Sequence, residues 1–467
     1  MGRRKCVGMG RNEKRFWDER TRESRAVVDG DPRKSLFDAF VPHGIARWEP
    51  LLDHWTWKRY EDAMSRCREL ATLDHPAMSE WLLVRAESLA SSTIEDIHAS
   101  ARRVARVEAR RDLFGETPPG TESEVLRNIW VTQHATELAS SDTDLTVDLL
   151  CQMHMTLMGD APISGQVRNR QVWVGSGAFG GPIEARHVAP PVEHVSALLE
   201  DLMDFVNHSD GHPLLRAAVA HAQFETIHPF ADGNGRTGRA LIQYMLMREG
   251  VISGSTLPVS AALTLERHRY FDTLNSYRVV CDPDDGARSK AAMPWIRMFA
   301  EAATYAAVLH DRLNKHIEAL TRRWEMQARA NRIRPSNAAF KLLGKLPANP
   351  VVTTSKVQEL LGVNKRTAQN AVARLVDAEI LVQRSAGRAN RVYESSDLLD
   401  AYREASRGQL AVLTAKPEMP DTAVLPLAES VSGLLCGAAN KRGGSCAHPR
   451  PRPGGTCPAG HQQQPQS

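Results

Sequence analysis

The sequence predicts a mainly α-helical protein in which strands are confined to two short pairs. Apolar residues recur at helical spacing over long stretches of the 467-residue chain, including 36–89, 212–227 and 310–330. Apolar runs typical of strands, interrupted or bounded by glycine, stand out near 165–175 and 380–393, which favours a β-hairpin at the first position and a strand pair at the second. The composition, 42% hydrophobic and 24% charged, is that of an ordinary soluble protein, and the length predicts two to four domains.

Six segments are expected along the chain. Residues 1–35 are rich in Lys and Arg and lack apolar periodicity, so we expect a disordered basic lead. Helical patterns predict an N-terminal helical region over 36–90, a central helical core over 91–310 and a helical connector over 311–335. A helix-turn-helix unit over 336–405 precedes a tail, 406–467, whose Pro, Gly, Ala, Arg and Gln content predicts disorder.

The lead contains no apolar stretch of the kind found in secretory signals. The best candidate for a membrane span, near 291–309, is interrupted by Arg297 and Glu301. The seven cysteines are scattered, and those of the tail lack the Cys-x-x-Cys spacing of structural zinc sites, so we expect reduced thiols. A cytoplasmic protein without a membrane contact is therefore expected.

The twelve residues from His228 to Arg239 carry the strongest functional signal. Helical periodicity on both sides places them in a loop that enters a helix. Two glycines let backbone N–H groups approach an anion, and the positive end of the following helix favours negative charge. Arg236 and Arg239 suit phosphate groups, Asp232 suits a hard cation such as Mg²⁺, and the Asn234 amide can donate to the same phosphate oxygens.

His228 lies at the entrance to this loop and can take a proton near neutral pH, since an unperturbed imidazole has a pKa of about 6.5. Taken alone, a His before Pro is typical of a helix end, and Asp-Gly-Asn-Gly is typical of a turn. Their occurrence together with two arginines within twelve residues favours a triphosphate site over a plain turn. The spacing differs from that of a Walker loop.

Every fixed position of His-x-Phe-x-Asp/Glu-Gly-Asn-Gly-Arg-x-x-Arg, the signature of the Fic family, is present, so the sequence resembles that family. The resemblance implies an all-helical catalytic core and transfer of AMP from Mg·ATP to a Tyr, Thr or Ser hydroxyl of a target protein. It implies that His228 is the catalytic base, that Asp232 binds Mg²⁺ and that Phe230 anchors the loop in the core. Gly235 stands where Doc-like phosphotransferases have a Lys, which favours the adenylylating branch. The residues that would bind the nucleotide are Asp232, Gly233, Asn234, Gly235, Arg236, Thr237, Gly238 and Arg239.

A second segment, beginning at Ser91, fits the inhibitory motif of the same family, Ser/Thr-x-x-x-Glu-Gly/Asn. The resemblance implies that Glu95 pairs with Arg239 and displaces the γ-phosphate from its productive place. Asp96 departs from the motif, which has Gly or Asn at that position. The alternative is a capping box at a helix N-terminus, because Ser92 is followed three residues later by Glu95. We favour the inhibitory interpretation.

Residues 165–175 resemble the family's flap, a β-hairpin beside the active site. The edge of such a hairpin can receive a target segment by β-augmentation, although an ordinary surface hairpin has the same pattern. The resemblance places Val174 and Gly175 at the nucleotide. It also places Tyr270 and Phe271 beside the nucleotide base, with a plain core role as the alternative.

Residues 354–375 have the spacing of a helix-turn-helix, with Asn364 as the expected N-cap of the second helix. With the strand pair at 380–393 as a wing, the unit resembles a winged helix. The alternatives are DNA binding and a protein-contact or dimerisation role, and the whole-chain charge of +4 does not require nucleic acid. The residues that could contact DNA are Lys365, Arg366, Gln369, Asn370, Arg384, Arg388 and Arg391.

Three functions follow from these patterns. The leading hypothesis is a self-inhibited protein adenylyltransferase that uses ATP and Mg²⁺. The second is a Fic transferase with another nucleotide donor, which would transfer UMP or phosphocholine. The third is a winged-helix DNA-binding regulator whose Fic core only senses nucleotide. A homodimer is compatible with each of them.

Overall fold

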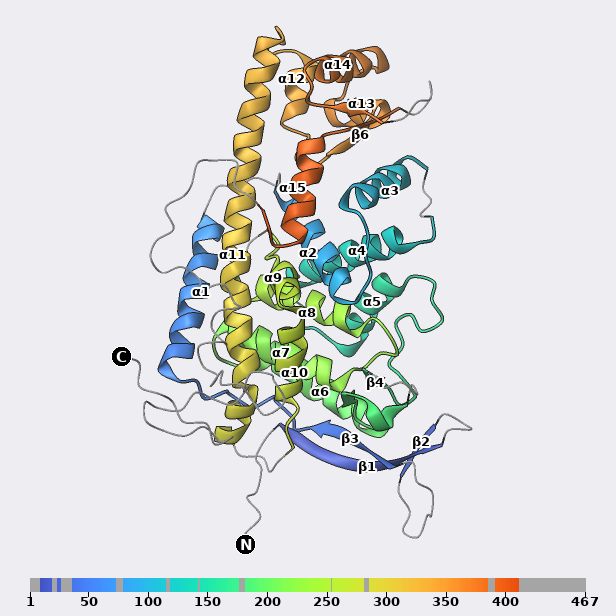
Figure 1. Ribbon diagram of the computed structural model, residues 1–467, viewed down its shortest axis with the longest axis vertical. Coiled ribbons are helices and arrows are strands. Elements are labelled where there is room, and N and C mark those ends of the chain that lie inside the picture. Colours follow the sequence, from blue (N-terminus) through green and yellow to red (C-terminus); the bar gives the residue numbers. More distant parts are fainter. Residues whose placement is uncertain are drawn as a thin grey trace, which may run out of the picture. The chain divides into compact units, whose positions relative to one another are not determined.

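The computed structural model describes residues 9–18, 23–26, 36–72, 79–114, 118–141, 143–175, 181–252, 254–280, 285–384 and 391–410. The chain separates into two units, Met1–Leu413 and Thr414–Ser467, and the second unit lies outside the described residues, as does almost all of the tail that the sequence predicts to be disordered. The described part of the first unit is mainly helical, which confirms the predicted fold class (Figure 1).

The helices between residues 54 and 330 precede a smaller group between residues 338 and 406. None of the described helices combines the length and the apolar content needed to span a membrane. Their bounds are α1 (His54–Thr72), α2 (Glu80–Ile94), α3 (Ala101–Phe114), α4 (Thr121–Ala139), α5 (Val147–Met158), α6 (Val192–His208), α7 (Pro213–Ile227), α8 (Asn234–Arg248), α9 (Val259–Leu265), α10 (Arg267–Tyr277), α11 (Asp285–Ala330), α12 (Ala338–Leu343), α13 (Thr354–Leu361), α14 (Lys365–Asp377) and α15 (Ser396–Ser406).

The strands of the described residues form three small antiparallel sheets. The first has the order β2-β1-β3, with β1 (Gly10–Asp18), β2 (Glu23–Ala26) and β3 (Leu36–Pro42). The second pairs β4 (Trp173–Val174) with β5 (His187–Val188), and a short 3₁₀ turn, η1 (Pro182–Glu184), precedes β5. The third has the order β6-β8-β7, with β6 (Val351–Thr353), β7 (Val382–Gln383) and β8 (Val392–Glu394).

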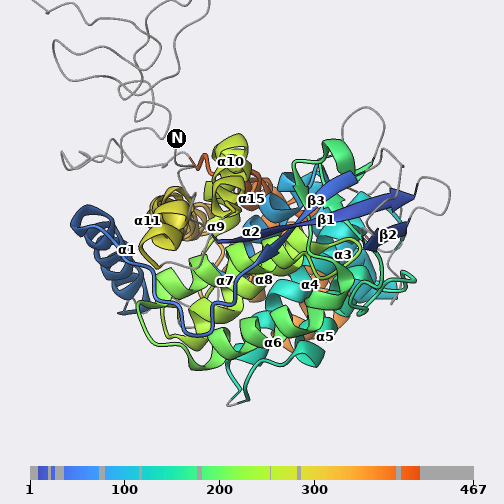
Figure 2. The same ribbon diagram turned by 90° about the horizontal axis from the view of Figure 1, so that it is seen from below.

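The expectation of a disordered lead is wrong for residues 10–18 and 23–26, which are strands. The lead looks structureless in sequence because β1 is polar. Its partner β3 is apolar, with Phe37, Ala39, Phe40 and Val41 buried, and strand pairing with β3 supplies what periodicity does not. The sheet lies at the end of the core near β4 and β5 (Figures 1 and 2), and β3 packs against β5 through Val188.

The centre of the core is α7, whose residues from Leu214 to Ile227 are all buried. A helix buried all round needs neighbours on every side, and α6, α8, α11 and β3 provide them. Trp295 of α11 is fully buried here, and its indole N–H donates to the Ala218 carbonyl at 2.7 Å. The loop that follows α7 is therefore attached to a buried helix that is packed on every side.

Two predicted segment borders are wrong because single helices cross them. The border after residue 90 falls inside α2, and the border after residue 310 falls inside α11, a continuous helix of 46 residues. Alanine-rich sequence keeps α11 helical, and Pro294 lies in its N-terminal third without ending it. The expected N-terminal helical region also begins with a strand, β3.

The C-terminal group contains the predicted pair of helices, α13 and α14, and the predicted strand pair, β7 and β8. The Asn364 side chain accepts a hydrogen bond from Thr367 N at 2.9 Å, which confirms it as the N-cap of α14. The strand β6, which the sequence did not indicate, completes the sheet by pairing with β8. Apolar residues of α12, α14 and α15 join those of α2 and α11 in one core cluster, so this group packs onto the helix that carries Glu95.

Candidate active site

The loop after α7 starts with a left-handed turn at His228, whose φ is 50° and ψ is 62°. Its backbone N–H donates to the Phe224 carbonyl at 2.9 Å and ends the helix. Two residues later Phe230 is fully buried, as expected for a core anchor. His228, which is partly buried, is thus held between the fully buried α7 and the anchor residue Phe230.

The Asn234 side chain closes this loop. Its Oδ1 accepts from Phe230 N and its Nδ2 donates to Phe230 O, both at 2.9 Å. One N–H of the amide group is therefore used within the loop, and donation of the second N–H to phosphate oxygens stays a prediction. Asp232 differs: it is exposed, and its Oδ1 accepts from Gly233 N at 2.6 Å, so its second carboxylate oxygen is available to a cation.

The glycines of the loop have three different roles. Gly233 adopts a φ of 76° at the start of α8, a conformation that favours glycine. A Cβ at Gly235 would overlap Oε1 of Glu95, so this glycine admits the carboxylate to the N-terminus of α8. A Cβ at Gly238 would lie 2.8 Å from Phe224 and from Glu225, both on α7. Gly238 therefore allows close packing of α8 on α7, and its place at the nucleotide stays a prediction.

Several buried polar atoms around the loop have no hydrogen-bond partner among the described residues. Arg236 and Arg239 are 6% and 1% exposed, yet each keeps a guanidinium nitrogen unpaired, and Thr237 Oγ1 is unpaired beside them. Buried donors without partners are costly, so their presence at a helix N-terminus points to an anion that completes the site. The unpaired atoms are Arg236 Nε, Thr237 Oγ1, Arg239 Nη1 and His228 Nδ1.

Arg168, which the sequence placed only in the flap region, holds the flap base to the catalytic loop. Its Nε donates to the His228 carbonyl at 2.8 Å, and its Nη2 donates to the Pro190 carbonyl at 2.6 Å and the Ile227 carbonyl at 3.3 Å. Burial, together with the positive charges of Arg278 and Arg168, lowers the pKa of His228 to about 3. The His228 imidazole is consequently neutral at pH 7.

His154 on α5 is a second residue that sequence patterns missed. Its ring stacks on Phe230 with 3.8 Å between centroids and an angle of 2°. Gly165 N donates to its Nδ1 at 3.0 Å, which leaves Nε2 to donate to the Asp232 carbonyl, also at 3.0 Å. Helix α5, the start of the flap segment and the catalytic loop meet at this one side chain. No local pattern reveals it, because its partners lie 11 and 78 residues away.

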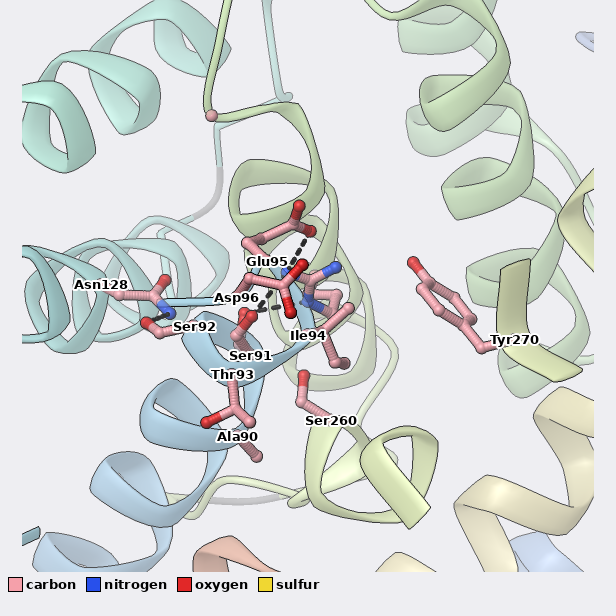
Figure 3. Close-up of polar contacts among 12 residues, drawn as sticks. Ala90, Ser91, Ser92, Thr93, Ile94, Glu95, Asp96, Asn128, Ser260 and Tyr270 are labelled. Carbon is pink, nitrogen blue, oxygen red and sulfur yellow. Dashed lines mark hydrogen bonds and ion pairs between the residues drawn. The ribbon is translucent and has the colours of Figure 1, made fainter. Parts of the chain in front are cut away.

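The last turn of α2 lies against the N-terminal part of α8 (Figure 3). Arg239 Nε donates to Ser91 Oγ at 2.9 Å, and its Nη2 donates to Ser91 O and to Glu95 Oε1, both at 2.8 Å. The capping-box interpretation is wrong, because Ser92 and Glu95 lie at the C-terminal end of α2. Asp96 adopts a φ of 59°, so it takes up the left-handed geometry that Gly or Asn would provide.

The remaining predicted site residues lie nearby with mixed roles. Val174 is in β4, and Gly175 follows it with a φ of 69°; Arg186 N donates to both of their carbonyls at 3.0 Å. Tyr270 on α10 is buried, and its hydroxyl is 2.8 Å from His221 Nε2 and points toward the Glu95 group (Figure 3). Phe271 is partly buried and lies under the Arg267 guanidinium. Both aromatic residues thus contribute to packing around the site.

The loop brings together a helix N-terminus, two buried guanidinium groups and a neutral imidazole. Residues 144–246, which contain all of these elements, match the model of the Fic/DOC family. The match confirms the resemblance found in the sequence, and the chain carries a Fic/DOC family domain over these residues.

The chain is similar to known proteins over part of its length. It is 34% identical over 118 residues to the protein adenylyltransferase fic-1 of Caenorhabditis elegans, which covers 24% of this chain and 21% of that protein. It is 32% identical over 142 residues to the protein adenylyltransferase Fic of Aedes aegypti, covering 29% and 25% respectively. The chain therefore spans about a fifth to a quarter of these curated relatives. A Fic family protein from Desulfovibrio desulfuricans superposes with a TM-score of 0.45 at 22% identity, over 75% of this chain and 98% of that one.

Proposed function

We propose that the chain is a protein adenylyltransferase, which moves AMP from Mg·ATP to a hydroxyl side chain of a target protein. The observation that carries this proposal is the group of buried, unpaired donors on Arg236, Thr237 and Arg239 beside the neutral imidazole of His228. A triphosphate would give these donors their missing acceptors, and its charge would offset the guanidinium groups that depress the pKa of His228. The similarity to named adenylyltransferases supports the same activity.

In the proposed reaction, the target hydroxyl oxygen attacks the α-phosphorus as His228 takes its proton. The bond between the α-phosphorus and the bridging oxygen breaks, and pyrophosphate leaves. Negative charge that develops on the phosphate oxygens is met by Arg236, Arg239 and the backbone N–H groups at the start of α8. Asp232 would hold Mg²⁺, which would neutralise phosphate charge when bound.

We also propose that Glu95 inhibits this reaction by occupying Arg239. Its carboxylate lies over Gly235 and bonds a guanidinium that is almost fully buried, so the anion of the protein takes the place of the anion of the substrate. Arg267 supports the docked position by donating to the Ile94 carbonyl at 2.8 Å, while its contact with the exposed Asp96 contributes little. A phosphate group could take the place of the Glu95 carboxylate on Arg239 only after that carboxylate leaves.

Parallel labelling with α-labelled ATP, UTP and CTP tests the donor. We expect label from ATP, in a Glu95→Gly variant more than in the wild type, and none in a His228→Ala variant. Label from UTP alone would instead support the transferase with another nucleotide donor. Equal labelling by His228→Ala and the wild type would exclude both transferase hypotheses.

Exposed polar residues on α14 favour DNA binding as a second candidate function. Lys365, Arg366, Gln369 and Asn370 are all exposed, as a groove-reading helix requires. Arg384, by contrast, is bonded to the buried carboxylate of Glu394 at 3.2 Å, so it is engaged within the protein. Retention on duplex DNA that weakens steeply with salt would support this function, and no retention at low salt would exclude it.

A further inference from the structure

Helix α2 is held between two neighbours. One face of its last turn carries Ser91 and Glu95 toward Arg239, while another face packs against α15 of the C-terminal group (Figure 1). The contact includes Trp81 of α2 and Tyr402 of α15, whose rings meet edge to face with 6.1 Å between centroids. Helix α2 is therefore contacted by α15 near its N-terminus and by Arg239 at its C-terminal end.

A pocket of about 460 Å³ opens where α2, α3, α9 and α15 meet. Its wall includes Leu89 and Thr93 of α2, the latter two residues before Glu95, and Leu399 of α15. The volume lies within the range of about 300–1,000 Å³ that is usual for small-molecule sites. We name it the α2–α15 pocket.

The charged groups on the pocket wall are mostly positive. Arg102, Arg403 and Arg407 supply three guanidinium groups, and Asp400 supplies the one carboxylate. Asp400 lies 2.7 Å from Arg403 and 3.8 Å from Arg102, which leaves Arg407 without a carboxylate partner among the described residues. Next to these cations, the wall includes the half-buried Ala99, with the buried Leu89 and Leu399 behind it, and these residues are apolar. This combination suits a ligand with one phosphate group and an apolar body.

We propose that the α2–α15 pocket binds a small organic phosphomonoester, and that the bound ligand holds α2 in its docked position. A ligand favours the conformation that contains its site, and this pocket exists with Glu95 bonded to Arg239. Binding across α2 and α15 would then strengthen inhibition at Arg239. This second step rests on the proposed inhibition by Glu95, whereas binding to the pocket does not.

Titration calorimetry at fixed ionic strength, with phenyl phosphate as the probe and the full chain as the receptor, tests the binding. The double variant Arg403→Glu, Arg407→Glu should weaken binding at least tenfold. A matched variant, Lys315→Glu with Arg322→Glu, reverses two exposed charges on α11 and should leave binding unchanged. Inorganic phosphate should bind more weakly than phenyl phosphate. No binding by the wild type, or equal binding by all three proteins, would overturn the proposal.

Hydrogen–deuterium exchange tests the effect on α2 without relying on activity. Phenyl phosphate should slow exchange of residues 91–96 in the wild type and leave it unchanged in the Arg403→Glu, Arg407→Glu variant. Unchanged or faster exchange with bound ligand would refute the docking step. AMP transfer should fall with phenyl phosphate in the wild type only, and not in Glu95→Gly. If Glu95→Gly transfers no AMP, the proposed function fails while the calorimetry and exchange results still decide the pocket.

Discussion

Replacing Glu95 with Gly should release AMP transfer from inhibition. The substitution removes the carboxylate that is bonded to Arg239 at 2.8 Å, while both hydrogen bonds from Arg239 to Ser91 remain. Arg239 Nη1 and Nη2 then become available to phosphate oxygens, and the space over Gly235 opens.

The size of this effect follows from the burial of the two partners. The Arg239 side chain is 1% exposed, whereas that of Glu95 is 35% exposed, so water screens the pair from one side. A hydrogen bond to a charged group contributes about 1.5–3 kcal/mol, and this screening places the contact at the lower end. About 1.4 kcal/mol is a factor of ten in an equilibrium constant. The fraction of the protein in which Arg239 is free of the Glu95 carboxylate should therefore be roughly tenfold higher in Glu95→Gly than in the wild type.

The assay is the initial rate of labelling by α-labelled ATP below saturation, where the rate follows the fraction of protein that can bind ATP. Asp96→Gly is the matched control, because it removes a carboxylate one residue later and Gly suits the left-handed backbone there. Asp96 is 67% exposed and contacts Arg267, so its loss should change the rate less than twofold. Equal rates for Glu95→Gly and wild type, or equal increases in both variants, would refute the inhibitory role.

Three further results are expected. Arg168→Met should lower the free energy of unfolding in urea by more than about 2 kcal/mol, because buried carbonyls including that of His228 lose their donor; a smaller change would contradict its role in holding the loop. Gly235→Ala should speed hydrogen exchange of the last turn of α2, since its Cβ would displace Glu95; unchanged exchange would count against that contact. Burial lowers the pKa of His221 to about 3, below its unfolded value near 6.5, so its contribution is present above pH 6.5 and declines as pH falls toward 3. The stability difference between wild type and His221→Asn should therefore narrow from pH 7 to pH 4, and a constant difference would be inconsistent with a neutral buried His221.

The sequence predicted the parts of the site that are contiguous. The loop from His228 to Arg239 and the turn carrying Ser91 and Glu95 were readable because each is a local run whose residue types match one chemical task. Two details within the loop were not, because Asn234 and Gly238 have their partners in Phe230 and α7, which only the folded chain brings into contact.

Residues that act across the sequence were missed for the same reason. His154 meets Asp232 across 78 positions, and Arg168 meets His228 across 60. Strand β1 was missed because pairing with β3, and not an apolar pattern of its own, holds it in the sheet. The length of α11 was missed because its role changes along the helix from core to connector while its helical pattern continues.

Intact-protein mass spectrometry after incubation with Mg·ATP tests the central claim most directly. The protein and a target extract would be compared for the wild type, Glu95→Gly, and Glu95→Gly with His228→Ala. The proposed function predicts a mass gain of one adenylyl group, which is AMP less water, on a protein hydroxyl with Glu95→Gly, less with the wild type, and none when His228 is also replaced. A gain that persists without His228, or no AMP gain with Glu95→Gly on the protein or in the extract, would contradict adenylyl transfer by this site.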